Sequence, residues 1–159
     1  MLSERNLPAS VVFIGGGVIA LEFSHVYARA GAKVTILEVL PRLLENMDAD
    51  AVAQLRTETE RIGVAIHTGV EVQRVEKAAG RLRVVYVEGG SERTVEAEQI
   101  VNGAGRVANV PGLDLAAGAV MAEHGRIAHD PYLRSTSNEA AFVCGDVVAE
   151  HAQLPDRYL

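Results

Sequence analysis

Residues 10–23 have the sequence S-V-V-F-I-G-G-G-V-I-A-L-E-F, and this stretch decides the fold. Its first five residues form an apolar run rich in β-branched side chains, which predicts a strand buried on both faces, as in a parallel sheet. Beyond the glycines, apolar residues recur at helical spacing, and they are Ile19, Phe23, Val26 and Ala30. They predict an α-helix that Gly31 ends.

The turn between this strand and helix has the pattern Gly15-x-Gly17-x-x-Ala20. Gly15 permits a tight turn, Gly17 lets a pyrophosphate approach the backbone, and Ala20 lets the helix pack closely on the sheet. The unpaired N–H groups and positive dipole end of the helix then face the phosphates. The pattern therefore predicts a dinucleotide site, given a strand before it and a helix after it.

The next strand, residues 33–37, ends at Glu38. A carboxylate at this position can accept both hydroxyls of an adenosine ribose and repels a 2′-phosphate. We therefore expect NAD(H) in preference to NADP(H). Arg42 complicates this expectation, because its guanidinium could reach a 2′-phosphate.

The remaining elements follow from shorter signals. Asp48 or Asp50 can cap a second helix that ends at Gly63, and residues 64–66 form a third strand. Three strand-like runs at residues 70–75, 82–87 and 94–97 follow, separated by turn signals at 79–80 and 89–90, with 90–91 as the expected centre of the second turn. Residues 100–101 return to the parallel sheet. We predict an α/β fold, namely a Rossmann-like parallel sheet with helices on both faces and an inserted three-stranded antiparallel β-meander.

The composition is that of a single globular domain. The chain has 159 residues, 48% of them apolar, and a net charge of −6 without a basic block. We therefore expect no binding to nucleic acid or to a membrane. The one cysteine, Cys144, lies in an apolar run that predicts burial, and a chain without a disulfide is expected in the cytoplasm. The five histidines show no metal-ligand spacing, so no metal site is expected.

Three stretches in order resemble the pyridine nucleotide–disulfide oxidoreductases, the family of dihydrolipoamide dehydrogenase, glutathione reductase and mercuric reductase. They are G-G-G-V-I-A-L-E-F at residues 15–23, G-A-G-R-V-A-N at 103–109, and R-S-T-S-N-E-A-A-F-V-C-G-D-V at 134–147. The resemblance covers nearly the whole chain. It implies a domain that holds NAD(H) and positions the nicotinamide for hydride transfer to FAD.

The resemblance also implies a role for each cofactor-binding residue. Gly15, Gly17 and Ala20 would hold the pyrophosphate, and Glu38 the adenosine ribose. Four further positions match the family: Glu22 and Gly105 near the nicotinamide end, Val70 at the adenine, and Asp146 at the ribityl chain of FAD. Three of these four residues also have a purely structural interpretation. Glu22 can be a helix-surface glutamate, Val70 a core valine and Asp146 a helix cap.

We expect residues 1–120 to form the NAD(P)-binding Rossmann domain. Residues 121–159 would be a linker and a fragment of the FAD-domain segment that carries the Gly-Asp motif. The family's redox-active cysteine pair, FAD fingerprint and acid–base residue are absent from the sequence. The isolated chain should therefore contain no catalytic residue and be inactive.

The parent protein would supply FAD and dimerisation domains and form a homodimer. Two alternatives stay open. The chain can be the corresponding domain of an NADH oxidase or ferredoxin reductase-type flavoenzyme, or a free-standing NAD(H)-binding module.

Overall fold

The computed structural model describes residues 6–78, 80–105, 108–123 and 125–148. It divides into two compact units, Met1–Gly105 and Arg106–Leu159, which are described separately below. This division follows packing and falls after Gly105. The functional boundary after residue 120 is a different division and stays a prediction.

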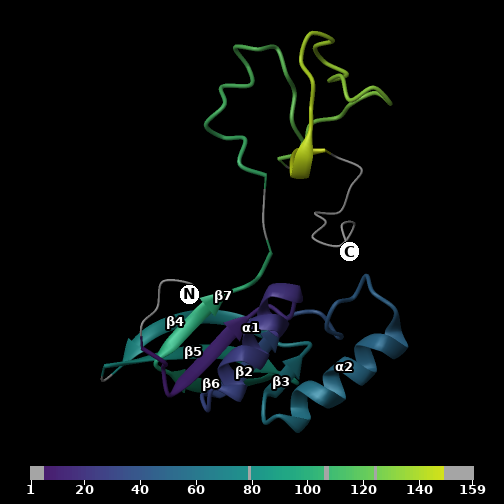
Figure 1. The fold of residues 1–159 in the computed structure, drawn as a ribbon. Coiled ribbons are helices and arrows are strands. Elements are labelled where there is room, and N and C mark those ends of the chain that lie inside the picture. Colours follow the sequence, from purple (N-terminus) through teal and green to yellow (C-terminus); the bar gives the residue numbers. More distant parts are fainter. Residues whose placement is uncertain (1–5, 79, 106–107, 124, 149–159) are drawn as a thin grey trace. The chain divides into compact units, whose positions relative to one another are not determined.

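The first unit is built on a four-stranded parallel sheet in the order β3-β2-β1-β7 (Figure 1). Its strands are β1 (Ser10–Ile14), β2 (Lys33–Glu38), β3 (Ala65–Thr68) and β7 (Gln99–Asn102). Two helices connect them, α1 (Val18–Arg29) and α2 (Ala49–Arg61). The strand–turn–helix–strand unit predicted from residues 10–38 is therefore present, and the α/β fold class is confirmed.

Alternate residues of β1 face two different cores, as the period of two in a strand requires. Val11 and Phe13 pack on the helix side with Leu21 and Val52, whereas Val12 packs on the other side with Val84. All six side chains are at most 4% exposed. Burial on both faces explains why the run is continuously apolar rather than alternating.

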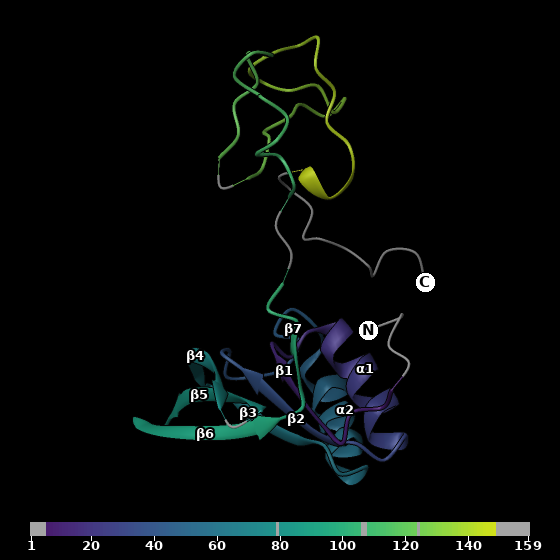
Figure 2. The same cartoon turned by 90° about the vertical axis from the view of Figure 1, so that its left-hand side faces the viewer.

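The second face of the sheet is covered by an antiparallel meander of β4 (Glu71–Ala78), β5 (Arg81–Glu88) and β6 (Ser91–Ala97). Figure 2 shows α1 and α2 on one side of the parallel sheet and this meander on the other. The inserted meander is as predicted. The sequence also predicts helices on both faces of the sheet. Within the described residues, helices cover one face only. The meander covers the other face, where Val84 and Tyr86 of β5 fill the second core.

The second turn of the meander is centred one residue earlier than predicted. Glu88 pairs with Ser91, so Gly89 and Gly90 occupy the turn, with φ of 57° and 78°. Positive φ at both central residues suits a tight hairpin turn that glycine adopts without strain. The expected centre at residues 90–91 is therefore wrong.

The two helices begin differently. Asp48 caps α2, because its side chain accepts hydrogen bonds from the N–H groups of Asp50 and Ala51. That confirms one of the two predicted caps. The N-cap of α1 is Gly17, which makes no side-chain capping bond.

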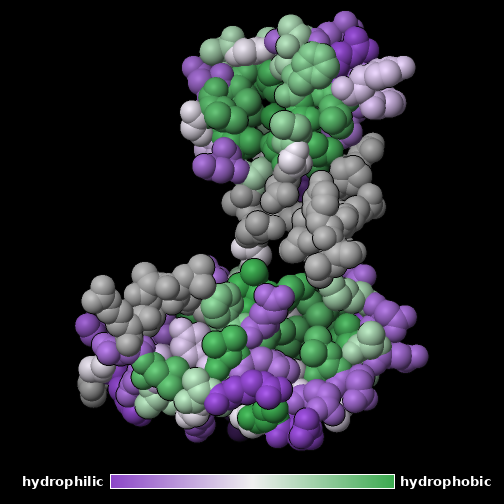
Figure 3. All heavy atoms as spheres, viewed as in Figure 1, coloured by the Kyte–Doolittle hydropathy of each residue, from purple (hydrophilic) through white to green (hydrophobic). Residues whose placement is uncertain are grey.

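The buried stripe of α1 differs from the apolar residues that predicted the helix. Its buried residues are Ala20, Leu21, Ser24 and Tyr27. Ile19 and Val26 are instead 51% and 61% exposed. In Figure 3, hydrophobic surface of the first unit lies over the region where Figure 1 draws α1.

The second unit has a small core of Ile127, Val143 and Val148, and a short 3-10 helix, η1 (Gly145–Val147). Cys144 precedes η1 and is exposed. Its predicted burial is therefore wrong, because the neighbouring Val143 takes the inward position and an extended backbone turns adjacent side chains to opposite sides.

Candidate functional site

The glycine turn lies at the carboxyl end of β1, the strand with β2 on one side and β7 on the other. The backbone of the turn is bonded to both neighbours. Gly15 donates its N–H to the carbonyl of Leu37 at 2.8 Å, and Gly103 donates to the carbonyl of Ile14 at 2.7 Å. Ligands of open α/β sheets bind beyond the carboxyl ends of the strands at such a switch point.

Gly15 and Ala20 are explained by packing within the protein. Gly15 has a φ of +100°, and a Cβ added there would lie 2.4 Å from the carbonyl oxygen of Gly103. Ala20 is 1% exposed, and its methyl group lies 3.5 Å from the position that a Cβ on Gly103 would take. The small residues therefore let α1 and the end of β7 approach the turn closely.

Gly17 has no such explanation. Its φ of −77° and ψ of −179° are open to any residue, and a Cβ added there meets nothing within 4 Å. The fold does not require glycine at this position, so the space beside it is free for a ligand. This is the packing that a pyrophosphate passing over the backbone requires.

The first turn of α1 offers donors to that space. N–H groups at the start of a helix have no helical carbonyl to bond, and the helix dipole adds a partial positive charge there. The first turn contains no acidic residue and no side-chain cap. No side chain of the first turn therefore competes with an anion for these N–H groups.

Glu38 lies beside the turn and is only 7% exposed. Its Oε2 accepts a hydrogen bond from the N–H of Gly16, and its Oε1 accepts one from the N–H of Leu40 at 2.8 Å. An ionised carboxylate can accept about four hydrogen bonds, so capacity remains for the hydroxyls of a ligand. The sequence predicted the place of Glu38, but no pattern of residues signalled that it holds the middle glycine of the turn.

Arg42 is engaged within its own loop. Its Nη1 donates to the carbonyl of Met47 at 3.0 Å, and its Nη2 donates to the carbonyl of Glu45. The structure thus gives Arg42 partners within its own loop, and a contact of its guanidinium with a 2′-phosphate stays a prediction.

The other predicted site residues are more scattered. Glu22 is exposed on α1, and Gly105 is exposed at the end of the first unit with a φ of +104°. Val70 is 1% exposed within the second core, so its side chain cannot contact an adenine in this conformation, while its N–H donates to the carbonyl of Glu38 at 3.1 Å. Asp146 belongs to η1 of the second unit, and its side chain lies outside the described part of the structure.

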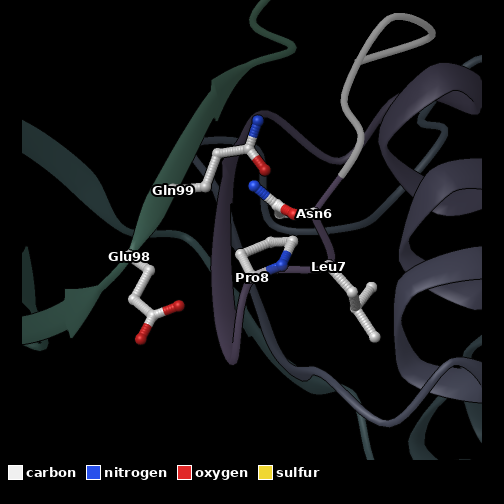
Figure 4. Close-up of a pocket in the computed structure, with 5 residues that line it drawn as sticks. All are labelled: Asn6, Leu7, Pro8, Glu98 and Gln99. Carbon is white, nitrogen blue, oxygen red and sulfur yellow. The ribbon is translucent and has the colours of Figure 1, made fainter.

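A shallow pocket lies at the other end of the strands, beside the amino-terminal ends of β1 and β7. Its lining residues are Asn6, Leu7, Pro8, Glu98 and Gln99 (Figure 4). Asn6, Leu7 and Pro8 precede β1, Glu98 precedes β7 and Gln99 begins it, whereas the glycine turn follows β1. The pocket is therefore separate from the site around Gly17 and Glu38.

The second unit contains a charged turn at Asp130. The carboxylate accepts from the N–H groups of Tyr132 and Arg134 and from the guanidinium of Arg134 at 2.8 Å. Partial desolvation alone would raise the pKa of Asp130, but the hydrogen bonds from Arg134 and Tyr132 outweigh it and lower the pKa. The ionised carboxylate thus braces this turn.

Among residues 6–78, 80–105, 108–123 and 125–148, no three His, Cys, Asp or Glu side chains are grouped to hold a metal ion. His124 and His151 fall outside these ranges. None of the helices in the same ranges is long and apolar enough to cross a membrane.

Comparison with known proteins agrees with this geometry. A family model described as pyridine nucleotide-disulphide oxidoreductase matches residues 1–157. The dihydrolipoyl dehydrogenase of Mycobacterium tuberculosis is 32% identical over 145 residues, which are 91% of this chain and 31% of that protein. The chain thus spans about a third of the length of such curated relatives.

Solved structures show the same likeness. The HOCl-induced flavoprotein disulfide reductase RclA from Escherichia coli matches with a TM-score of 0.84 and 27% identity, over 96% of this chain and 34% of that one. An engineered water-forming NADPH oxidase bound to NADPH matches with a TM-score of 0.76 and 28% identity, over 89% of this chain and 30% of that one.

Proposed function

The chain belongs to the pyridine nucleotide–disulfide oxidoreductase family, and from this premise we propose that it holds NAD(H) and positions the nicotinamide for hydride transfer to a flavin. The resemblance found in the three sequence stretches is confirmed by this membership. Members of the family are FAD-dependent oxidoreductases that use pyridine dinucleotides. The cofactor supplies the hydride, and the residues of this chain bind and orient it.

One observation carries the proposal: the hydrogen bond from Gly16 to Glu38 joins the glycine turn to the carboxylate. The pyrophosphate then lies over Gly17 against the first-turn N–H groups of α1, where no side chain intervenes. The adenosine ribose lies at Glu38, whose free acceptor positions take its hydroxyls. Gly15 and Ala20 keep the turn close to the sheet and act through its backbone.

Three further residues of the first unit belong to the proposed dinucleotide site, and Asp146 of the second unit is proposed for a separate contact with FAD. Glu22 and Gly105 serve the nicotinamide end. Val70 takes part through its backbone carbonyl, because its side chain is buried in the core. Asp146 contacts the ribityl chain of FAD in the complete protein.

We propose NAD(H) rather than NADP(H) on two grounds. First, the buried carboxylate of Glu38 opposes a 2′-phosphate: two unit charges 4 Å apart interact by about 4 kcal/mol at an effective dielectric of 20. Solvent reduces this repulsion, but a tenfold preference needs only about 1.4 kcal/mol. Second, Arg42 already donates to two backbone carbonyls.

The remaining proposals concern a longer protein. Its FAD and dimerisation domains would complete the enzyme as a homodimer in the cytoplasm, and the acceptor would be chosen by those domains. Within the chain, residues 1–120 would bind the dinucleotide and 121–159 would lead into the FAD domain. This chain alone would then be inactive.

A second candidate function is a domain of an oxidase-type flavoenzyme. The similarity to a water-forming NADPH oxidase, 28% identical over 89% of the chain, favours this candidate. The gene decides between the two, because a C-x-x-x-x-C pair upstream indicates disulfide chemistry and its absence indicates the oxidase. A native product of about 17 kDa would instead indicate a free-standing NAD(H)-binding module.

Titration of the purified protein with NADH and NADPH, followed by heat or nicotinamide fluorescence, tests the proposal. We expect NADH to bind at least about tenfold more tightly. Tighter binding of NADPH would overturn the cofactor preference and keep the site. Binding of neither would overturn the proposed function of this chain.

A further inference from the structure

The loop between β2 and α2, residues 39–47, forms one wall of the proposed ribose site. Leu43 of this loop is 1% exposed, and a Cβ added to Gly16 would lie 2.4 Å from its Cδ2. The side chain of Leu43 therefore packs directly on the middle glycine of the turn. The same Cβ position is 3.1 Å from the Cβ and the Oε2 of Glu38, so Leu43 and Glu38 both border the space beside Gly16.

The loop also touches Glu38 from the other side. Leu40 donates its N–H to Oε1 of Glu38 at 2.8 Å, while its carbonyl accepts from the N–H of Gly69 at 2.8 Å. The start of the loop is thus fixed both to the carboxylate and to the end of β3. The orientation of the carboxylate depends on where this loop lies.

Arg42 holds the rest of the loop closed. Its guanidinium donates to the carbonyls of Glu45 and Met47, and Met47 donates its N–H to the carbonyl of Leu44 at 2.8 Å. Leu44 has a φ of +45°, a conformation that non-glycine residues rarely adopt. A strained residue of this kind persists only when its surroundings fix it, and the planar guanidinium bridges the two carbonyls beyond it.

We propose that Arg42 is a positioning residue for the adenosine half of NAD(H), a role that rests on the function proposed above. It closes the loop, so that Leu43 packs on Gly16 and Leu40 holds the carboxylate of Glu38 toward the ribose. The cation acts on backbone carbonyls of its own loop and is not a ligand of a 2′-phosphate. From the sequence alone, this arginine is only a residue that could reach a 2′-phosphate.

The two roles make different predictions for Arg42→Met, which keeps an apolar stem of similar length and removes the donors. If Arg42 positions the loop, affinity for NADH and for ADP-ribose falls by about tenfold, a change of about 1.4 kcal/mol, because both ligands contain the adenosine ribose. If it binds a 2′-phosphate, only the affinity for NADPH falls. Arg42→Lys should recover a part of the NADH affinity, because an ammonium can donate to one carbonyl but cannot bridge both in the plane of a guanidinium.

The matched control is Arg61→Met. Arg61 lies in the last turn of α2, where its exposed side chain pairs with Glu58 of the same helix at 2.7 Å. This variant removes the same charge from the same unit and should leave both affinities unchanged. A loss of affinity that Arg42→Met and Arg61→Met share would reflect the change in net charge of the protein and not a role of Arg42 in the loop.

Hydrogen exchange of the purified protein without ligand adds a readout that does not depend on NADH. In Arg42→Met, exchange within residues 39–47 should rise at least about fivefold, and in Arg61→Met it should stay at the wild-type rate. Thermal unfolding of each variant checks that the fold is retained.

The results separate the failure of this inference from the failure of the proposed function. Weaker binding of NADH and ADP-ribose with faster exchange in the loop supports it. If the wild type binds NADH and Arg42→Met binds it equally well, the positioning role is overturned. If the wild type binds no NADH, the proposed function fails and the ribose role with it, while exchange still shows whether Arg42 closes the loop.

Discussion

Replacement of Gly17 by threonine should abolish most dinucleotide binding and leave the fold intact. Gly17 is the N-cap of α1, with extended backbone angles that a β-branched residue adopts easily. Its added side chain would meet no protein atom within 4 Å of the Cβ position. Threonine and glycine are about equally good N-caps, so the free energy of unfolding should change by less than about 0.5 kcal/mol.

The loss of binding can be estimated from the donors at the helix start. The threonine side chain occupies the space over which the pyrophosphate must pass, and so keeps the phosphates away from the first-turn N–H groups. A hydrogen bond to a charged group contributes about 1.5–3 kcal/mol. Loss of even one such bond corresponds to a Kd for NADH about 10- to 100-fold higher.

Calorimetric titration with NADH and urea unfolding of the same preparations measure both effects. Gly15→Ala is the contrasting control, because its Cβ would collide with the Gly103 carbonyl at a φ of +100°. That variant should lose at least about 2 kcal/mol of stability. Wild-type NADH affinity in Gly17→Thr would refute the placement of the pyrophosphate, and strong destabilisation of Gly17→Thr would refute the claim that the fold does not need this glycine.

Three further predictions concern charge and packing. Glu38→Gln should bring the ratio of NADPH to NADH affinity, measured by fluorescence titration, to within about threefold of one, because the charge opposing a 2′-phosphate is gone; an unchanged ratio would show that Glu38 does not set the preference. Ala20→Leu should lower the free energy of unfolding by about 1–3 kcal/mol, since Ala20 is 1% exposed beside Gly103; urea unfolding at wild-type stability would contradict this close packing. Asp130→Asn should speed hydrogen exchange of the turn that Asp130 braces at neutral pH. The pKa of Asp130 is lowered in the folded protein. The ionised carboxylate therefore stabilises the turn above the usual aspartate pKa of about 3.9, and this stabilisation is lost as the pH falls through the lowered value. A difference in exchange rate between Asp130→Asn and wild type that persists in acid would contradict the role of the ionised carboxylate.

The strand, glycine turn and helix of the site could be predicted because consecutive residues specify them. A continuously apolar strand, a glycine turn and a helix of the right length together specify the unit up to Glu38, and the structure contains it. Asp48 as a cap belongs to the same class, since the capping bonds reach only two and three residues along the chain.

The contacts between distant residues could not be predicted in the same way. Gly16 and Glu38 are 22 residues apart, and their hydrogen bond depends on the register of two strands and the path of the following loop. Arg42 shows the same limit, because its type and position suggested an anion ligand whereas its partners are two carbonyls in its own loop. The predicted burial of Cys144 is wrong because a short apolar run does not show which of its side chains turns inward.

The most direct test of the dinucleotide site is to locate bound NADH on the protein by following backbone amide signals in nuclear magnetic resonance spectra during a titration. We predict that the largest shifts fall on residues 16–20 at the glycine turn and on residues 38–40 beside the ribose carboxylate. Shifts confined to Asn6, Leu7, Glu98 and Gln99, at the opposite edge of the sheet, would contradict the account, as would a titration that moves no amide signal.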